Sequence, residues 1–322
     1  MSILKENIML YRGLSIALIV PCYNEEKTIY QVVSDFKQQM PEIDTYVFDN
    51  CSTDNTQSEA LRSGAKVISV KQKGKGNVVR RMFADVDADV YVMVDGDATY
   101  DATSVNALVD ELIDSRLDMV VGCRKVIAEE NVNAYRLGHE FGNKLLTQSV
   151  TQIFGGQFTD MLSGYRAFTR RYVKSFPALS KGFEIETELT VHALELRMPY
   201  GEIITAYGER PEGSTSKLST YKDGFRILKT IFRLFMREKP LFFFSIIAVV
   251  LFITSMTLSF PVFAEYFETG LVPRLPTAIL SALLMLAMFL SIACGLILDN
   301  VNIGRHESRR LAYLMIANTD RK

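Results

Sequence analysis

Residues 90–101 read VYVMVDGDATYD, and this stretch decides the fold. Its first part, VYVMV, is continuously apolar, as is typical of a strand buried on both faces of a parallel sheet. The strand ends in Asp95-Gly96-Asp97. Because residues two apart on an extended backbone point the same way, the two carboxylates are expected to converge. The glycine between them lets the chain bend close to a ligand.

Shorter apolar runs repeat this pattern along the chain. They are SIALIV (15–20), TYVFD (45–49), KVISV (66–70) and DMVVG (118–122). Helical segments are expected between them, starting near residue 24, after residue 56 and over 101–115. Alternating strands and helices predict a doubly wound α/β domain with a Rossmann-like, mostly parallel sheet. Ligands bind beyond the carboxyl ends of such strands, so the candidate site comprises residues 21–25, 49–54, 95–97 and 122–124.

Two common nucleotide-binding motifs are missing. The first strand runs into Pro-Cys-Tyr-Asn rather than a G-x-G-x-x-G turn. Gly74-Lys75-Gly76 lacks the third glycine and follows the third strand. The sequence also has no G-x-x-x-x-G-K-[ST] loop. A nicotinamide-binding domain and a P-loop nucleotidase are therefore excluded.

Composition excludes further classes of protein. The chain of 322 residues carries 36 Lys+Arg and 37 Asp+Glu, a net charge of −1, which argues against a nucleic-acid partner. Its 4 cysteines include no C-x-x-C pair, which excludes a disulfide scaffold and a cysteine-rich zinc module.

Two long uncharged runs lie near the C-terminus, over residues 241–264 and 275–298. As helices they would each extend about 36 Å, against about 30 Å for the hydrocarbon core of a bilayer. They predict two transmembrane helices. The alternative is a buried helical hairpin inside a large soluble domain.

Basic residues flank this pair of runs on both outer sides. Lys and Arg recur over residues 222–239 and again at 305–322, whereas the linker between the runs holds only Arg274. The positive-inside rule places both flanks in the cytoplasm. The first apolar run, 16–20, is too short for a signal peptide. We therefore expect an integral membrane protein whose first 218 residues and both termini are cytoplasmic.

The segment before the first span is amphipathic. Aromatic and aliphatic residues recur at helical spacing over 221–236, with Lys and Arg beside them. Such a helix is typical of a membrane interface; the alternative is a core helix with a solvated basic edge. The predicted division of the chain is a cytosolic domain (1–218), an amphipathic helix (219–240), spans at 241–264 and 275–298, and a cytoplasmic tail (299–322).

Asp95 and Asp97 are candidate metal ligands. Convergent carboxylates are hard oxygen ligands suited to Mg²⁺ or Mn²⁺, and Mg²⁺ is often held by one or two carboxylates plus substrate phosphates. The alternative is a strand-terminating turn, because Asp and Gly favour turns.

Several motifs in a fixed order carry a family resemblance. The chain resembles family 2 glycosyltransferases with a GT-A fold, within the group of dolichyl- and polyprenyl-phosphate sugar synthases. The resemblance covers residues ~15 to ~220. The matching segments are IVPCYNEEKTI (19–29), VFDNCSTDNT (47–56), KGKGNVVRRMF (73–83), VMVDGDATYD (92–101), VVGCRK (120–125), FTDMLSGYRAF (158–168), GFEIETELTVHAL (182–194) and ERPEGSTSKL (209–218).

The resemblance implies roles for individual residues on the donor side. Pro21, Tyr23 and Glu25 would line the pocket for the nucleotide base and ribose. Asp49 would contact the uridine. Lys75 would also bind the donor.

On the reacting side, the resemblance implies that Asp95 and Asp97 form the D-x-D motif that holds the metal on the donor diphosphate. Arg124, Arg136 and Arg166 would bind phosphate of donor or acceptor. Lys217 would lie on a loop that closes over the site. We expect Arg124 and Lys217 to offset the phosphate charge that develops in catalysis.

Some of these residues have plainer alternatives. Arg166 could pair with Asp160 and stabilise the sheet edge. Glu184 and Glu186 could be ordinary acids at a helix N-terminus. Cys22 is expected to be a packed residue rather than a nucleophile, because no histidine is near it in sequence.

The resemblance implies inverting transfer of one sugar, from a UDP-hexose to undecaprenyl phosphate at a bacterial inner membrane, and allows self-association into a homo-oligomer. The chain has no Trp, so it lacks the Q-x-x-R-W motif of processive relatives. An ionised lipid phosphate needs no general base. The apolar face of 135–154, with Arg136 beside it, could meet the lipid; a buried packing helix is the alternative. Two other functions stay open: a non-phosphate acceptor such as a glycolipid or diacylglycerol, and a non-catalytic membrane scaffold.

Overall fold

The computed structural model describes residues 10–126, 137–208, 210–211 and 220–317. The chain divides into two compact units, Met1–Lys229 with Arg309–Lys322, and Thr230–Ser308. The strands are β1 (Ile16–Cys22), β2 (Asp44–Asp49), β3 (Lys66–Ser69), β4 (Val90–Met93), β5 (Met119–Val126), β6 (Arg166–Thr169) and β7 (Tyr200–Tyr207). The helices of the first unit are α1 (Ile29–Gln39), α2 (Thr56–Arg62), α3 (Lys75–Asp85), the 3-10 helix η1 (Ala102–Ser104), α4 (Val105–Asp114), α5 (Leu137–Phe154), α6 (Arg170–Ser175) and α7 (Ile185–Glu195).

One mixed sheet organises the first unit. Among the described residues its strand order is β3-β2-β1-β4-β6-β5-β7. Strands β1 to β4 are mutually parallel, and β5 pairs with β7 in parallel. Strand β6 runs antiparallel to both of its neighbours, β4 and β5. The predicted α/β fold with a mostly parallel sheet is confirmed, and all five predicted strands are present.

Strands β6 and β7 were not predicted. Strand β6 has only four residues, all buried, so it shows neither alternation nor a long apolar run. Its short RAFT sequence becomes a strand because it fills the position between β4 and β5. Tertiary pairing decides such a strand, and no local pattern reveals it.

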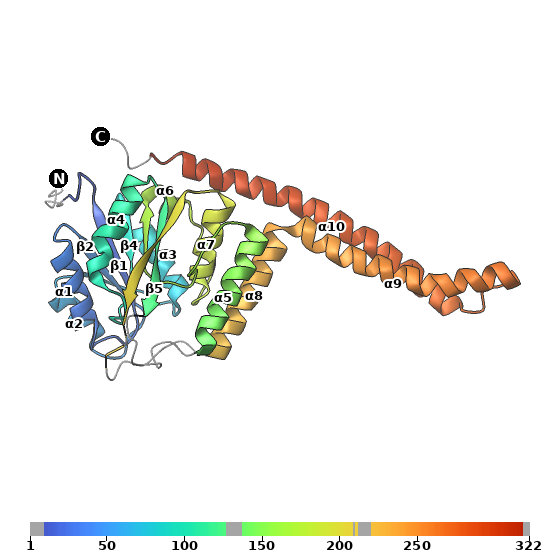
Figure 1. Cartoon of the computed structure of the whole chain (residues 1–322), viewed down its shortest axis with the longest axis horizontal. Helices are drawn as coiled ribbons and strands as arrows, with labels where there is room; N and C mark the ends of the chain where they lie inside the picture. Colours follow the sequence, from blue (N-terminus) through green and yellow to red (C-terminus); the bar gives the residue numbers. More distant parts are fainter. Residues whose placement is uncertain (1–9, 127–136, 209, 212–219, 318–322) are drawn as a thin grey trace. The chain divides into compact units, whose positions relative to one another are not determined.

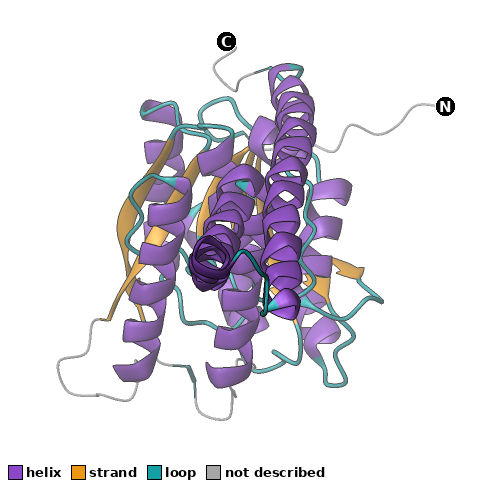
Figure 2. Cartoon of the chain, turned by 90° about the vertical axis from the view of Figure 1, so that its right-hand side faces the viewer, coloured by secondary structure: helices purple, strands orange, loops and turns teal. Residues whose placement is uncertain are grey.

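Helices pack on both faces of the sheet (Figures 1 and 2). Helices α1, η1 and α4 lie on one face, and α3, α6 and α7 on the other. Residues 17–20 of β1 and 90–93 of β4 are almost fully buried, as expected for central strands covered on both sides. Each fully buried Val or Ile contributes about 1.5–3 kcal/mol to folding. This core fixes the carboxyl ends of β1, β2 and β4 along one edge.

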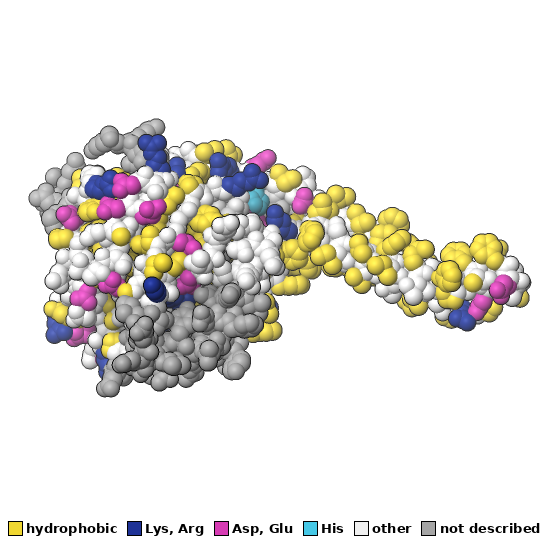
Figure 3. Space-filling view, in the orientation of Figure 1, with side chains coloured by type: hydrophobic (Ala, Val, Ile, Leu, Met, Phe, Trp, Pro, Cys, Tyr) yellow, Lys and Arg dark blue, Asp and Glu magenta, His cyan; other side chains and the backbone are white. Residues whose placement is uncertain are grey.

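The second unit contains two long apolar helices, α9 (Pro240–Thr269) and α10, which extends to Leu314 (Leu275–Leu314). Both are long and apolar enough to cross a membrane, and only 11% and 22% of their most hydrophobic windows are buried. The buried-hairpin alternative would require largely covered windows. Figure 3 shows hydrophobic side chains along this hairpin, with charged ones near the connection between the helices. Two long apolar helices are thus confirmed, and they suggest membrane anchoring.

Close backbone approach and serine hydroxyls join α9 to α10. Ser255 Oγ donates to the carbonyl of Ser281 at 2.8 Å, and Ser291 Oγ to that of Phe244 at 3.3 Å. A Cβ on Gly295 would lie 3.1 Å from the Cβ of Phe244, so a larger residue there would require the two helices to shift by a few tenths of an ångström. Small residues at helix contacts are common where lipid supplies no hydrophobic drive for association.

The segment predicted as a tail begins as helix. Arg309 lies 2.9 Å from Glu195, Arg310 donates to the carbonyl of Leu196, and Tyr313 donates to Asp118 at 2.7 Å. Residues 309–314 therefore pack within the same unit as the sheet.

Helix α8 (Thr220–Glu238) covers the predicted amphipathic segment. Ile227, Ile231 and Leu234 are buried, whereas Phe225 and Phe232 of the predicted apolar face are exposed. The helix thus has a second apolar face that the sequence interpretation missed.

Candidate active site

Three loops at the carboxyl edge of the sheet have an unusual backbone. Asn24, Cys51 and Ala98 follow β1, β2 and β4 with φ values of 53°, 62° and 58°. This left-handed region costs a non-glycine residue about 1–2 kcal/mol. Side-chain bonds stabilise the first loop, where Asn24 Oδ1 accepts from the Thr53 backbone N–H at 2.8 Å. Such strained turns beside one another mark a candidate functional edge.

Asp95 faces a buried lysine. Lys75 Nζ lies 2.5 Å from Asp95 Oδ1 and 2.6 Å from Glu186 Oε1. Burial would lower the pKa of the Lys75 ammonium, but the two carboxylates outweigh it and raise that pKa. Burial also raises the pKa of Glu186, an effect that Lys75 opposes. Glu186 is therefore part of this cluster, rather than only an acid at the start of α7.

Glycines bring Lys75 to this place. A Cβ on Gly74 or Gly76 would lie 2.1 Å from the carbonyl oxygen of Lys181 or 2.2 Å from that of Ser180. The K-G-K-G sequence therefore lets the start of α3 press against the backbone that precedes α7. This close approach puts the lysine between the two carboxylates.

Asp97 faces an arginine that the sequence interpretation missed. Arg210 Nη2 lies 2.5 Å from Asp97 Oδ2, and the other oxygen, Oδ1, accepts from the Thr99 hydroxyl at 2.6 Å. Arg210 belongs to the ERPEGSTSKL segment, in which the resemblance implies a role for Lys217 alone. Lys217 lies outside the described residues, as does Arg136.

The glycine between the two aspartates is required by packing. A Cβ on Gly96 would lie 2.6 Å from Cys22 Sγ. Cys22 is buried, and burial raises the pKa of its thiol well above the usual value. Its predicted packing role fits this environment.

The predicted donor residues lie at the ends of β1 and β2. Tyr23 is 38% exposed, and Lys73 Nζ lies over its ring at 5.8 Å from the ring centre. Asp49 is buried and accepts from Gln57 at 2.7 Å. Glu25 is also buried, and its backbone N–H donates to Thr56 Oγ1. Pro21, the sixth residue of β1, pairs with Phe48 of β2.

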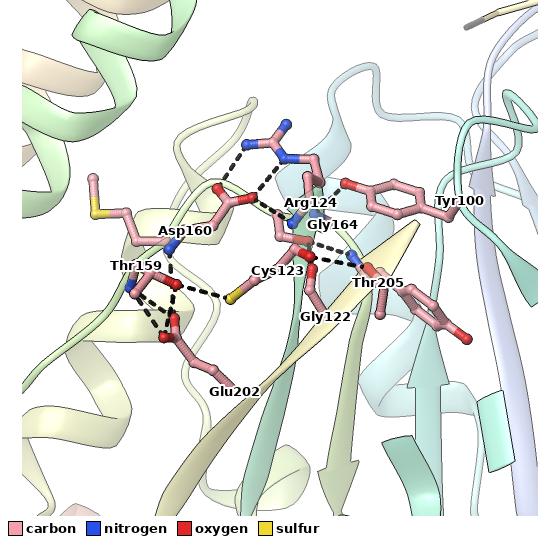
Figure 4. Close-up of polar contacts among 12 residues, drawn as sticks. Tyr100, Gly122, Cys123, Arg124, Thr159, Asp160, Gly164, Glu202 and Thr205 are labelled. Carbon is pink, nitrogen blue, oxygen red and sulfur yellow. Dashed lines mark hydrogen bonds and ion pairs between the residues drawn. The ribbon is translucent and has the colours of Figure 1, made fainter. Parts of the chain in front are cut away.

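Arg124 lies at the carboxyl end of β5 in a network of polar contacts. Figure 4 shows its guanidinium facing the Asp160 carboxylate, with Nε–Oδ2 and Nη2–Oδ1 distances of 2.6 and 2.7 Å. The Tyr207 ring centre is 5.5 Å from its guanidinium carbon. Glu202 of β7 accepts from the backbone N–H and the hydroxyl of Thr159, both at 2.9 Å. Arg124 is therefore held in place, with its charge at the edge of the sheet.

The prediction that Arg166 binds phosphate is wrong for this structure. Its side chain is fully buried and donates to the carbonyls of Met161 and Ser163 and to Thr190 Oγ1. Burial lowers the pKa of this guanidinium. The alternative prediction, that Arg166 pairs with Asp160, is also wrong, because Asp160 forms its ion pair with Arg124. A phosphate at the edge of the sheet cannot reach a group enclosed between strand and helix.

The side chains present fit a divalent cation. Asp95 and Asp97 offer carboxylate oxygens, which Mg²⁺ and Mn²⁺ prefer. Glu186 Oε2 is buried without a hydrogen-bond partner in the described part of the chain, so this cluster has acceptor capacity to spare. Two cations, Lys75 and Arg210, pair with these carboxylates, and Arg124 pairs with Asp160 at the carboxyl end of β5.

The family model and the relatives that match this chain point to one protein family. The family model for glycosyl transferase family 2 matches residues 17–176. Protein RfbJ of Shigella flexneri is 56% identical over 130 residues, 40% of this chain and 99% of that protein. Glycosyltransferase AglJ of Haloferax volcanii is 34% identical over 232 residues, 72% of this chain and 75% of that one. A dolichyl-phosphate hexose transferase of the same organism is 26% identical over 224 residues, 70% of this chain and 95% of that one.

A solved structure agrees in fold. Glucosyl-3-phosphoglycerate synthase of Mycobacterium tuberculosis, in complex with Mn²⁺, UDP-glucose and phosphoglyceric acid, superposes with a TM-score of 0.56. It shares 22% identity and matches 70% of this chain and 80% of its own. This likeness supports a GT-A-like domain. The chain therefore belongs to glycosyltransferase family 2, the enzymes that transfer a sugar from a nucleotide-sugar donor.

Proposed function

We propose that this protein transfers one hexose from a UDP-sugar to a polyprenyl phosphate at the cytoplasmic face of a bacterial inner membrane, with inversion at the anomeric carbon. The observation that supports a phosphate acceptor is that the carboxylates of the site are paired with cations. Asp95, Asp97, Asp160 and Glu186 each face a lysine or arginine within 2.7 Å. Carboxylates held in this way are poorly suited to take a proton from an acceptor hydroxyl.

A phosphate acceptor removes the need for a base. The second pKa of a phosphate monoester is about 6, so the group is largely ionised at pH 7. One of its oxygens attacks the anomeric carbon from the side opposite the nucleotide, and a new carbon–oxygen bond forms. The bond from that carbon to the diphosphate breaks, and its electron pair leaves with UDP. No proton has to move, and cations must position two anions.

The chain's own residues divide this work. Asp95 and Asp97 would hold Mg²⁺ or Mn²⁺, which neutralises charge on the leaving diphosphate. Lys75 and Arg210 stand within reach of the same charge, and Arg124 offers a guanidinium from β5. Tyr23, Glu25, Asp49 and Pro21 are proposed for the base and ribose. Arg136 and Lys217 keep their proposed roles toward the acceptor phosphate and in closing the site.

A surface suited to a membrane interface supports a lipid acceptor. The exposed Phe225, Leu228 and Phe232 of α8, with exposed Lys229 and Arg233, make a surface suited to an anionic bilayer interface. The two long apolar helices would anchor the chain there. The relative named for dolichyl-phosphate points to the same class of acceptor.

The test uses the purified chain in detergent with Mn²⁺, undecaprenyl phosphate and a panel of radiolabelled nucleotide sugars. We expect label from one UDP-sugar to enter the lipid phase, with loss of transfer in EDTA and in Asp97→Asn. Undecaprenol without phosphate is the matched control. Equal transfer to undecaprenol, or transfer to diacylglycerol alone, would overturn the proposed acceptor.

A further inference from the structure

Lys75 contacts two carboxylates, Asp95 and Glu186, that have different proposed roles. Asp95 is proposed to bind the metal, whereas Glu186 lies on α7. The lysine side chain is 9% exposed and that of Glu186 is 5% exposed, so solvent screens this pair little, whereas the Asp95 side chain is 27% exposed. Two carboxylates and one ammonium leave one negative charge in excess, and Glu186 Oε2 has no hydrogen-bond partner in the described part of the chain. The cluster is therefore under-neutralised where it is most buried.

The position of the lysine has no local explanation. Lys75 is the first residue of α3, and a cation at a helix N-terminus is unfavourable because the helix dipole is positive there. Gly74 and Gly76 nevertheless press this turn against the backbone of Ser180 and Lys181. The arrangement is thus built to bring an ammonium to Asp95 and Glu186.

Asp95 cannot bind both Lys75 and a divalent cation with full affinity. An ammonium 2.5 Å from Asp95 Oδ1 repels a divalent cation bound to the same carboxylate. Glu186 offers the lysine a second partner at 2.6 Å, so Lys75 can leave Asp95 without becoming an unpaired buried charge. An ammonium has three N–H donors, and those released from Asp95 become available to a phosphate oxygen.

We propose that Lys75 and the divalent cation compete for Asp95, and that Glu186 is the positioning residue that retains Lys75 and turns it toward the donor diphosphate when the cation binds. The inference rests on the proposed function, because it needs a metal on Asp95 and Asp97 and a diphosphate donor. Under this proposal Lys75 has two opposite effects on binding. It opposes the metal alone and favours the nucleotide once metal is bound.

The experiment measures both affinities on the full chain in detergent. Mn²⁺ alone is titrated by the electron paramagnetic resonance signal of free Mn²⁺, and UDP is titrated calorimetrically at saturating Mn²⁺. In Lys75→Met we expect Mn²⁺ alone to bind about tenfold more tightly, and UDP about tenfold more weakly, since a hydrogen bond to a charged group is lost. Lys73→Met is the matched control for Mn²⁺ alone, because it removes the same charge from the same loop. An equal tightening in Lys73→Met, or none in Lys75→Met, would overturn the competition.

A second variant covers the case in which Lys75→Met fails to fold. In Glu186→Gln the lysine has Asp95 as its one remaining carboxylate, and we expect Mn²⁺ alone to bind about tenfold more weakly. Unchanged Mn²⁺ affinity in a folded Glu186→Gln protein would contradict the positioning role. The double variant sharpens this test: if Glu186 acts through Lys75, adding Glu186→Gln to Lys75→Met changes little, whereas independent charges give additive effects.

Failure of the proposed function is distinguishable from failure of the inference. Asp97 pairs with Arg210 rather than Lys75. If Asp97→Asn leaves Mn²⁺ binding intact, the metal site itself is wrong. If Asp97→Asn abolishes Mn²⁺ binding while Lys75→Met does not change it, only the competition is wrong.

Discussion

The carboxyl end of β5 and the start of β6 lie side by side, yet they use arginine in opposite ways. Arg124 extends from β5 to a carboxylate and an aromatic ring at the edge of the sheet. Arg166 sits between Met93 of β4 and Val121 of β5 and donates to main-chain carbonyls. The partner, rather than the residue type or the motif, decides whether an arginine serves structure or substrate. A carboxylate can exchange its arginine for another cation, whereas a buried carbonyl has no substitute.

Replacing each arginine by methionine should separate the two roles. Arg166→Met should have the larger effect on the free energy of unfolding. It leaves the buried carbonyls of Met161 and Ser163 without their donor. We expect a loss of about 3–5 kcal/mol in the free energy of unfolding. Chemical denaturation of the detergent-solubilised protein measures it. A loss below about 1 kcal/mol would remove the structural role assigned to Arg166.

Sequence reasoning could not make this distinction. The SGYRAF motif shows that an arginine is present, but not that a four-residue antiparallel strand enters between β4 and β5. That insertion turns the side chain inward, toward Thr190 of α7. By contrast, Asp95 and Asp97 follow a strand whose apolar run is visible in the sequence. Their place at the carboxyl edge was therefore predictable, and Lys75 was predicted as a donor-binding residue. Arg210 and the pairing of Lys75 with Asp95 were not, because these pairs join distant segments.

Arg124→Met is the matched second case. Removing this guanidinium should lower the turnover number about 100-fold, as expected for a preorganised donor to developing charge. The free energy of unfolding should fall by about 2–3 kcal/mol, less than in Arg166→Met, because Asp160 is buried but keeps the backbone N–H of residue 124 as a donor. Transfer assays and denaturation on the same preparation give both numbers. Destabilisation as large as in Arg166→Met would erase the contrast between the two arginines.

Glu202→Gln probes what holds Arg124 in place. Glu202 fixes Thr159 and, through it, the neighbouring Asp160 that binds Arg124. Loss of one charged acceptor should lower turnover about fivefold, with little change in donor KM.

A second readout separates positioning from general damage. Cys123 Sγ lies 3.1 Å from Thr159 Oγ1, and burial raises the pKa of its thiol to about 12. Below that pKa the thiol stays protonated, so alkylation at pH 8 should be slow. Loosening of Thr159 in Glu202→Gln should speed it. Unchanged labelling together with unchanged turnover would show that Glu202 does not position Arg124.

The smallest expected effect concerns the ring beneath Arg124. Tyr207 supplies a cation–π contact at 5.5 Å, an interaction that contributes about 0.5–1 kcal/mol near a surface. Tyr207→Leu should therefore lower turnover only two- to fivefold. Tyr207→Phe keeps the ring and loses only the hydrogen bond between the hydroxyl and Thr99, so its turnover should stay above that of Tyr207→Leu. If Phe and Leu impair turnover equally, the hydroxyl of Tyr207, rather than its ring, is the group that turnover requires at this position. If neither variant changes turnover, the bidentate pair with Asp160 is sufficient to orient Arg124. Arg124 then depends on this one charged partner as strictly as Arg166 depends on its main-chain carbonyls.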